Sequence, residues 1–135
     1  MLYTSSIESV TAENLDGFFV GWPNRPSPQT HIELLKNSDE IILAIDEHTG
    51  KVAGFITALT DRTLSAYIPF LEVLPAYQGQ GVGKELVRRM LERLSDLYAV
   101  DLLCDPELQS FYAGVGMRQA HGMMIRKYER QAGNE

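Results

Sequence analysis

Apolar residues recur at helical spacing in one well-defined stretch of the chain. From Val82 to Leu94 they lie three or four residues apart, with charged residues between them, which predicts an amphipathic helix. Another helix is predicted to begin after Ser27, a residue type that caps helix N-termini, with Pro28 in the first helical position. This second helix is expected to continue through residues 29–37.

Two further helices are predicted from capping residues and glycines. Thr11 is a suitable N-cap for a helix that continues through an apolar stretch and ends near Gly21. Pro106 is placed to open a short helix, and Gly114 to end it. The chain is therefore expected to contain four helices.

Short runs of β-branched and other apolar residues predict the strands. Residues 40–59 hold two such runs on either side of the sequence DEHTG, in which Gly50 can supply the positive φ of a hairpin. A further strand, residues 64–74, contains Pro69, and we expect a bulge or fraying there because proline lacks the N–H that a strand donates. The remaining strands are predicted at residues 2–9, 99–104 and 117–128, the last as one strand or two.

The elements follow one another in the order β-α-α-β-β-β-α-β-α-β. This order predicts an α+β architecture, in which helices cover the faces of a mixed sheet. The chain has 135 residues, the size of one domain with a single core, and it contains no internal repeat or linker. We therefore expect a single domain over residues 1–135.

A glycine-rich turn, Gln78-Gly79-Gln80-Gly81-Val82-Gly83, opens the helix at 82–94. Free N–H groups and the helix dipole make such a junction suitable for binding an anion. A Walker phosphate loop would need a glycine at position 78 and Ser or Thr at position 85, which are Gln and Glu here. The dinucleotide pattern G-x-G-x-x-G would need a glycine where Lys84 stands. The pattern Q/R-x-x-G-x-G/A fits at every constrained position. A tight turn that caps the helix and holds no ligand is the alternative interpretation.

The fitting pattern resembles the pyrophosphate-binding motif of the GNAT superfamily of acetyltransferases. The resemblance extends over FLEVLPAYQGQGVGKELVRRML, which is similar to the family's fourth strand, loop and third helix. CDPELQSFYAGVGM is similar to a second signature of the family, and the order of elements matches along nearly the whole chain. The resemblance implies the acyl-CoA N-acyltransferase fold, with acetyl-CoA as co-substrate.

The resemblance also implies roles for particular residues. The backbone of residues 71–73 would pair with the pantetheine arm, and the amide of Val73 would polarise the thioester carbonyl. Tyr112 would contact the cofactor and protonate the leaving sulfur, although it could instead be a core aromatic residue. The implied cofactor-binding residues are Leu71, Glu72, Val73, Gln78, Gly79, Gln80, Gly81, Val82, Gly83, Lys84 and Tyr112.

The reaction also requires a general base, because an ammonium acceptor must lose a proton before it attacks. In several relatives the base lies at places that correspond to Tyr67 and Pro69, and neither residue is acidic or basic. Glu72 is the nearest carboxylate and is the candidate base, although regular strand alternation would turn it to the face opposite its neighbours. A water relay, or a base elsewhere such as Glu33, remains open.

Composition narrows the partners. The formal net charge of −6 argues against a nucleic-acid-binding surface, and no segment is apolar enough to span a bilayer. The single Cys104 and three scattered histidines give no metal-site spacing, and one cysteine fits the reducing cytoplasm. We therefore expect no metal, nucleic acid or membrane partner.

The leading hypothesis is an N-acetyltransferase in which a primary amine of a small molecule or peptide attacks acetyl-CoA directly. The alternatives are a CoA-binding module with little or no transferase activity, and a fold-only interaction domain. A homodimer through the C-terminal strands is a further expectation. Residues 18–28 fall where the family builds its acceptor pocket, and Trp22 would either form a wall of that pocket or pack the core.

Overall fold

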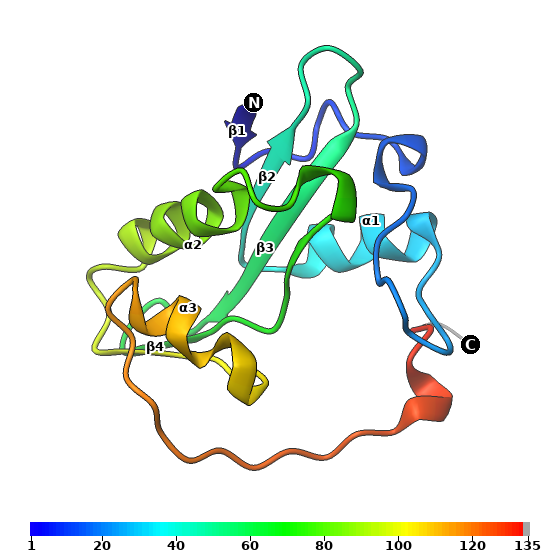
Figure 1. Cartoon of the computed structure of the whole chain (residues 1–135). Helices are drawn as coiled ribbons and strands as arrows, with labels where there is room; N and C mark the ends of the chain where they lie inside the picture. The colour runs from blue at the N-terminus through cyan, green and yellow to red at the C-terminus, as the bar shows by residue number, and fades with distance from the viewer. Residues whose placement is uncertain (134–135) are drawn as a thin grey trace.

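A six-stranded mixed sheet organises the protein (Figure 1). The computed structural model describes residues 1–133. Within them the strands run in the order β1-β2-β3-β4-β6, and β5 also pairs with β3. The strands are β1 (Leu2–Thr4), β2 (Glu40–Ile45), β3 (Val52–Thr60), β4 (Ser65–Tyr67), β5 (Leu71–Val73) and β6 (Ala99–Asp101).

Helices cover both faces of this sheet. They are α1 (Pro28–Asn37), α2 (Val82–Arg93) and α3 (Gln109–Ala113), with 3-10 turns η1 (Ala12–Leu15), η2 (Pro75–Tyr77), η3 (Pro106–Leu108) and η4 (Tyr128–Arg130). Ser27 caps α1 as predicted, and α2 begins directly after the glycine-rich turn. Within residues 1–133, each helix is too short or too polar to cross a membrane.

Side-chain alternation along β2 divides the core between the two faces. Ile41, Leu43 and Ile45 join one buried cluster, which contains residues of α1. Ile42 and Ala44 join the other, which contains residues of α2 and packs against α3. Because successive side chains of a strand point to opposite faces, α1 covers one face of the sheet, and α2 and α3 cover the other.

The break predicted at Pro69 divides one run into two strands. β3 is long enough to pair with β5 at one end and with β4 at the other. β4 pairs in parallel with β6, so β6 lies beside β4 but not beside β5. The far edge of β5 therefore carries no strand among the described residues. The hairpin at 40–60 is confirmed as well, with Gly50 at φ 77°.

The predicted helix over residues 11–21 is wrong beyond its first turn. Only η1 forms, and the chain then passes through left-handed conformations at Gly17, Phe19 and Gly21 (φ 97°, 63° and 82°). Such values cannot occur in a right-handed helix, so the chain changes direction repeatedly. Phe19 is notable, because a bulky residue rarely adopts positive φ.

The C-terminal strands predicted at 117–128 are also absent. Residues 117–127, named here the C-terminal arm, contain neither strand nor helix, and a single 3-10 turn, η4, follows them. Every residue from 118 to 130 is exposed. In Figure 1 the arm leaves the α3 side of the protein, passes along its lower border and returns near α1.

Candidate functional site

The glycine-rich turn takes backbone conformations that require glycine. Gly79 and Gly81 have φ values of 78° and 84°, in the left-handed region. A Cβ added at either position would meet no atom within 4 Å, so space alone would allow a larger residue. The backbone conformation is therefore what selects glycine, and it leaves the turn open to solvent.

Three N–H groups emerge unbonded from the start of α2. The first helical bond runs from the amide of Glu85 to the carbonyl oxygen of Gly81 (3.1 Å). Gly81 is the N-cap and offers no side-chain acceptor, so the amides of residues 82–84 have no partner within the helix. Lys84 is exposed on the same turn. Unbonded amides, the helix dipole and a lysine together favour an anion.

Gly83 brings α2, β5 and α3 together. A Cβ at this glycine would lie 3.6 Å from Val73 Cγ2 and 3.7 Å from Phe111 Cζ. The start of α2 is thus in contact distance of both the open strand and the short helix that carries Tyr112. The two sequence motifs of the family resemblance therefore meet in space.

The free edge of β5 presents two peptide groups. Leu74 donates its N–H to the carbonyl of Ala53 in β3 (2.9 Å). Because alternate residues of a strand direct their peptide groups to the same side, Leu71 and Val73 direct theirs away from β3. This edge is able to pair with an extended ligand that carries amides.

Gln78 connects the glycine-rich turn to that edge. Its side-chain Nε2 donates to the carbonyl oxygen of Val73 (3.0 Å). The bond occupies one of the outward acceptors of β5 and leaves the N–H of Val73 on the same edge. The glutamine of the motif therefore has a structural role.

Tyr112 lies half-buried on the α2 face of the sheet. Its ring packs against Phe111, with centroids 4.9 Å apart, and both side chains pack against the same buried cluster as Leu71 and Val73. Burial, together with a smaller contribution from Cys104, raises the pKa of Tyr112 to about 12. The phenol therefore keeps its proton at neutral pH and is able to donate it.

Glu72 points to the opposite face of the sheet from Leu71 and Val73. Its two carboxylate oxygens accept hydrogen bonds from the amides of Phe19 (2.8 Å) and Val20 (3.2 Å). These bonds hold the backbone at the residue with positive φ and fasten the loop before α1 to β5. Fifty-three residues separate Glu72 from Phe19, and no local pattern pointed to the contact.

The aromatic residues of the loop before α1 are mostly core. Phe18 and Phe19 are 3% and 2% exposed, whereas Trp22 is partly buried and packs against Phe19 and Phe70. These side chains therefore pack the core, which is one of the two interpretations of this segment. Phe18 and Phe19 form core, and Trp22 lies at its margin.

His31, which belongs to no motif identified in the sequence, is buried inside this aromatic group. Its ring centroid lies 5.3 Å from Phe18, 4.9 Å from Phe19 and 4.4 Å from Phe55. Neither ring nitrogen has a hydrogen-bond partner, and burial lowers the pKa of His31 to about 4. The imidazole is therefore neutral.

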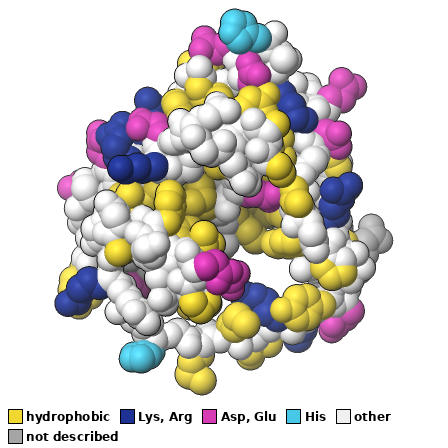
Figure 2. Space-filling model, viewed as in Figure 1, with side chains coloured by type: hydrophobic (Ala, Val, Ile, Leu, Met, Phe, Trp, Pro, Cys, Tyr) yellow, Lys and Arg dark blue, Asp and Glu magenta, His cyan; other side chains and the backbone are white. Residues whose placement is uncertain are grey.

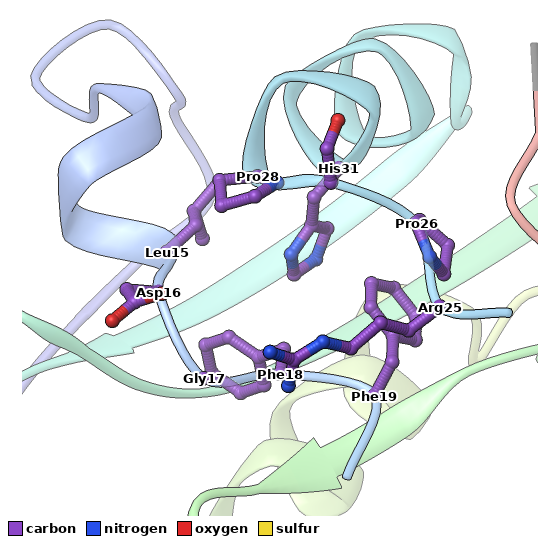
Figure 3. Close-up of a pocket in the computed structure, with 10 residues that line it drawn as sticks. Leu15, Asp16, Gly17, Phe18, Phe19, Arg25, Pro26, Pro28 and His31 are labelled. Carbon is purple, nitrogen blue, oxygen red and sulfur yellow. The ribbon is translucent and has the colours of Figure 1, made fainter. Parts of the chain in front are cut away.

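A cavity of about 130 Å³ lies beside His31 (Figure 3). The imidazole extends from α1 toward the loop that precedes this helix, and the side chain of Arg25 lies on the opposite side of the cavity. The lining residues are Leu15, Asp16, Gly17, Phe18, Phe19, Arg25, Pro26, Ser27, Pro28 and His31. None of them belongs to the glycine-rich turn or to β5, so this cavity is separate from the edge of β5.

A family model described as the Acetyltransferase (GNAT) family matches residues 7–117. The chain is 31% identical over 121 residues to an uncharacterised N-acetyltransferase, ycf52, of Pyropia yezoensis, covering 85% of this chain and 69% of that protein. It is 32% identical over 108 residues to the histone acetyltransferase TAP1 of Glycine max, covering 72% of this chain. The match spans only 46% of the soybean protein.

A solved structure from Deinococcus radiodurans R1, assigned to the acetyltransferases, is 42% identical and has a TM-score of 0.96. It covers 99% of this chain and 93% of its own. The glucosamine-6-phosphate N-acetyltransferase of Arabidopsis thaliana shares the fold, with a TM-score of 0.71 at 19% identity over 93% of this chain and 97% of its own. The α+β fold class expected from the sequence is confirmed.

Proposed function

Because the chain belongs to the GNAT acetyltransferase family, we propose that it transfers the acetyl group of acetyl-CoA to a primary amine of a small molecule or peptide. The observation that carries this proposal is the contact between the uncapped start of α2 and the open edge of β5. One offers unbonded amides to a diphosphate, and the other offers peptide groups to an amide-bearing arm.

The donor would bind along these two features. The amides of Gly79, Gln80, Gly81, Val82, Gly83 and Lys84 are the candidates to hold the diphosphate. Leu71 and Val73 would pair with the pantetheine arm, since they are the residues of β5 that face away from β3. The peptide group of Glu72 faces β3, so its part would come from the side chain. Gln78 would act through its bond to Val73.

The proposed step is a direct attack. The amine lone pair forms a bond to the thioester carbonyl carbon, and the carbonyl oxygen takes the negative charge beside the N–H of Val73. Collapse of this intermediate breaks the carbon–sulfur bond, and the thiolate takes the proton of Tyr112. The nitrogen releases its own proton to a base, and the phenolate is reprotonated from water. The step uses no metal.

Glu72 has two possible roles in this scheme, and one variant separates them. As the base, Glu72→Gln should lower kcat and remove the acidic limb of the pH profile. As an anchor of the loop at Phe19 and Val20, it should raise KM for the amine and leave the pH profile in place. A water relay would leave the pH profile unchanged in the same way.

Two measurements test the proposal as a whole. Calorimetric titration with acetyl-CoA should give saturable binding, and release of free thiol should depend on an added amine. Binding without amine-dependent thiol release would support the alternative of a CoA-binding module. No binding at all would support the other alternative, an interaction domain that keeps only the fold.

The role of Tyr112 has its own test. Tyr112→Phe keeps the ring in its packing and removes the phenolic proton. We expect kcat to fall by roughly 100-fold, in the range for loss of a general acid, while the affinity for acetyl-CoA changes little. An equal loss of turnover and affinity would show that the residue is structural.

The proposal defines the acceptor only as a primary amine of a small molecule or peptide. One relative is named for histones and one structural neighbour for glucosamine-6-phosphate, so an amine panel should include a lysine peptide and an amino sugar phosphate. We keep the cytoplasm as the proposed compartment, because the single Cys104 is compatible with reducing conditions.

A further inference from the structure

The cavity beside His31 has on its inner side a polar group that the described chain leaves unpaired. The imidazole is 1% exposed, and neither of its nitrogens has a hydrogen-bond partner within residues 1–133. A neutral imidazole carries one N–H donor and one bare acceptor nitrogen, and leaving such groups unpaired in the interior is unfavourable. This side chain therefore calls for a partner that the chain itself does not supply.

Arg25 supplies a positive charge on the other side of the same cavity. Its side chain lies opposite the imidazole in Figure 3, and it forms no ion pair or hydrogen bond with any residue from 1 to 133. The arginines of α2 differ, because Arg88 and Arg89 both pair with Glu85 (2.7 and 2.6 Å). Figure 2 shows basic and acidic side chains gathered together over α2. The guanidinium of Arg25 is therefore available to an anion.

The start of α1 adds to this positive potential. Ser27 and Pro28 line the cavity, and they are the N-cap and the first residue of a helix of 10 residues. The helix dipole places partial positive charge at this end. Asp16 also lines the cavity, but its carboxylate points away from the imidazole in Figure 3. The cavity therefore favours one negative charge between the imidazole and Arg25.

The remaining walls are mostly apolar and leave room for a small organic molecule. The apolar residues that form them are Leu15, Phe18, Phe19, Pro26 and Pro28. The cavity volume of about 130 Å³ is close to that of an engineered apolar cavity of roughly 150 Å³ that binds benzene. An inorganic anion would leave these walls without a contact, whereas the alkyl chain of a short carboxylate would cover them.

The cavity is distinct from the break that separates β4 from β5. The ring of Phe19 packs against both His31 and Phe70, with centroid distances of 4.9 and 6.3 Å. Phe70 directly follows the break at Pro69, and neither Phe70 nor Trp22 lines the cavity. The cavity therefore lies outside both the donor site on β5 and the acceptor pocket expected around Trp22.

We propose that this cavity binds a small aliphatic carboxylate of about two to four carbons, which is neither donor nor acceptor in the transfer reaction. Its two oxygens would accept hydrogen bonds from the guanidinium of Arg25 and from the N–H of His31. The occupant would also contact Phe19, whose amide donates to Glu72 (2.8 Å). It would thus stabilise the loop that is fastened to β5.

Propionate is the probe, and its binding is measured without turnover. Calorimetric titration of the full chain with sodium propionate, at an ionic strength kept constant with sodium chloride, should give saturable binding. We expect a dissociation constant in the millimolar range, because the ligand has few atoms. Propionamide has the same shape without the charge and should not bind. In proton–nitrogen correlation spectra, the ring nitrogens of His31 should shift with the same saturation.

A variant at the rim locates the bound carboxylate. Arg25→Gln should weaken propionate binding by roughly 10-fold or more, because a hydrogen bond to a charged group is lost. Arg25 is exposed, so this variant should keep its circular dichroism spectrum. Arg118→Gln is the matched control, because Arg118 is also exposed and forms no ion pair within residues 1–133. It should bind propionate as the wild type does.

A wild-type chain that does not bind propionate overturns the proposal, as does equal binding of propionamide. Unchanged affinity in Arg25→Gln would place the carboxylate elsewhere and overturns it too. Displacement of propionate by acetyl-CoA or by an amine substrate would place it in the transfer site, with the same consequence. Binding of propionate without binding of acetyl-CoA would contradict the proposed function and leave this proposal intact.

Discussion

The first N–H groups of α1 and of α2 have no acceptor within their helices, and the two helix starts treat these groups in opposite ways. At α1 the hydroxyl of Ser27 accepts the N–H of Thr30 (3.1 Å), and Pro28 has no N–H to satisfy. At α2 the N-cap is Gly81 in a left-handed conformation, and no side chain accepts the amides that follow. One helix start is closed by its own sequence, and the other is left open.

The difference indicates what each region serves. A side-chain cap stabilises a helix by only about a few tenths of a kcal/mol more than a glycine cap, so α2 forgoes a small contribution that α1 keeps. α2 forms nonetheless, because Val82, Leu86, Val87 and Met90 are buried against the sheet. Burial of that face leaves the helix start free to hold a ligand.

The largest expected effect comes from placing a side chain at the open start. Gly81→Val should weaken acetyl-CoA binding by roughly 100-fold, because a branched side chain at φ 84° displaces amides whose hydrogen bonds to a charged group contribute about 1.5–3 kcal/mol each. Isothermal titration calorimetry measures this change.

Gly50→Val is the matched control for that variant. Gly50 has φ 77° and lies in the β2–β3 hairpin, where an added Cβ would meet only Asn14 Nδ2 at 3.8 Å. Both variants should lose similar stability from backbone strain, and only Gly81→Val should lose affinity. Equal affinities would contradict an anion site at α2.

An effect of comparable size concerns the face that α1 covers. His31 has its pKa lowered from 6.5 to about 4 in the folded protein, so between these values the unfolded chain binds more protons. Stability should therefore fall as the pH drops from 6.5 toward 4, by about 3 kcal/mol in total. Urea unfolding across this range measures the change. Arg25 and Asp16 are charged residues that line the same cavity as His31, and they are the same in all samples.

His31→Leu supplies the control for this titration. Leucine fills a similar apolar space and cannot be protonated, so the stability of this variant should vary less between pH 6.5 and 4. An unchanged pH dependence would assign the effect to other groups. The affinity for acetyl-CoA at pH 7.5 should be the same in the wild type and in His31→Leu.

A smaller change is expected at the closed helix start. Ser27→Ala should lower the free energy of unfolding by about 1 kcal/mol, because the amide of Thr30 loses its acceptor. Thermal unfolding measures the loss. Acetyl-CoA affinity should stay within error of the wild-type value, and a clear loss of affinity would break the contrast between the two helices.

The smallest effect is expected at the lysine of the open start. Lys84→Gln should weaken acetyl-CoA binding by roughly two- to fivefold, because Lys84 is exposed and its charge is screened by solvent. The loss should shrink as salt is added. Lys36→Gln, in the last turn of α1, should leave the affinity unchanged.

The sequence predicted those parts of the fold that local chemistry determines. Ser27 and Pro28 begin α1, the glycines begin α2, and Pro69 breaks a strand, each through its own backbone preferences. The glycine-rich turn and Tyr112 were also identified from the sequence, and the structure brings them together through Gly83 and Phe111. Their proposed roles remain predictions.

The failures lie where distant contacts decide the conformation. The segment after η1 leaves the helical path because its backbone bonds to Glu72, far away in sequence, and Phe19 is held at positive φ. The arm has a strand-like sequence but pairs with no strand of the described chain. Local propensity cannot anticipate either outcome.

The hydrogen bond from Gln78 to Val73 fixes the glycine-rich turn at one distance from the strand edge. A donor gripped at its diphosphate would therefore reach a set depth, and its reactive carbonyl would stop at the same point each time. The site would therefore discriminate between donors by the length of the arm that joins the diphosphate to the thioester. Thioesters with a shortened arm would dock at the turn and yet fall short of Tyr112.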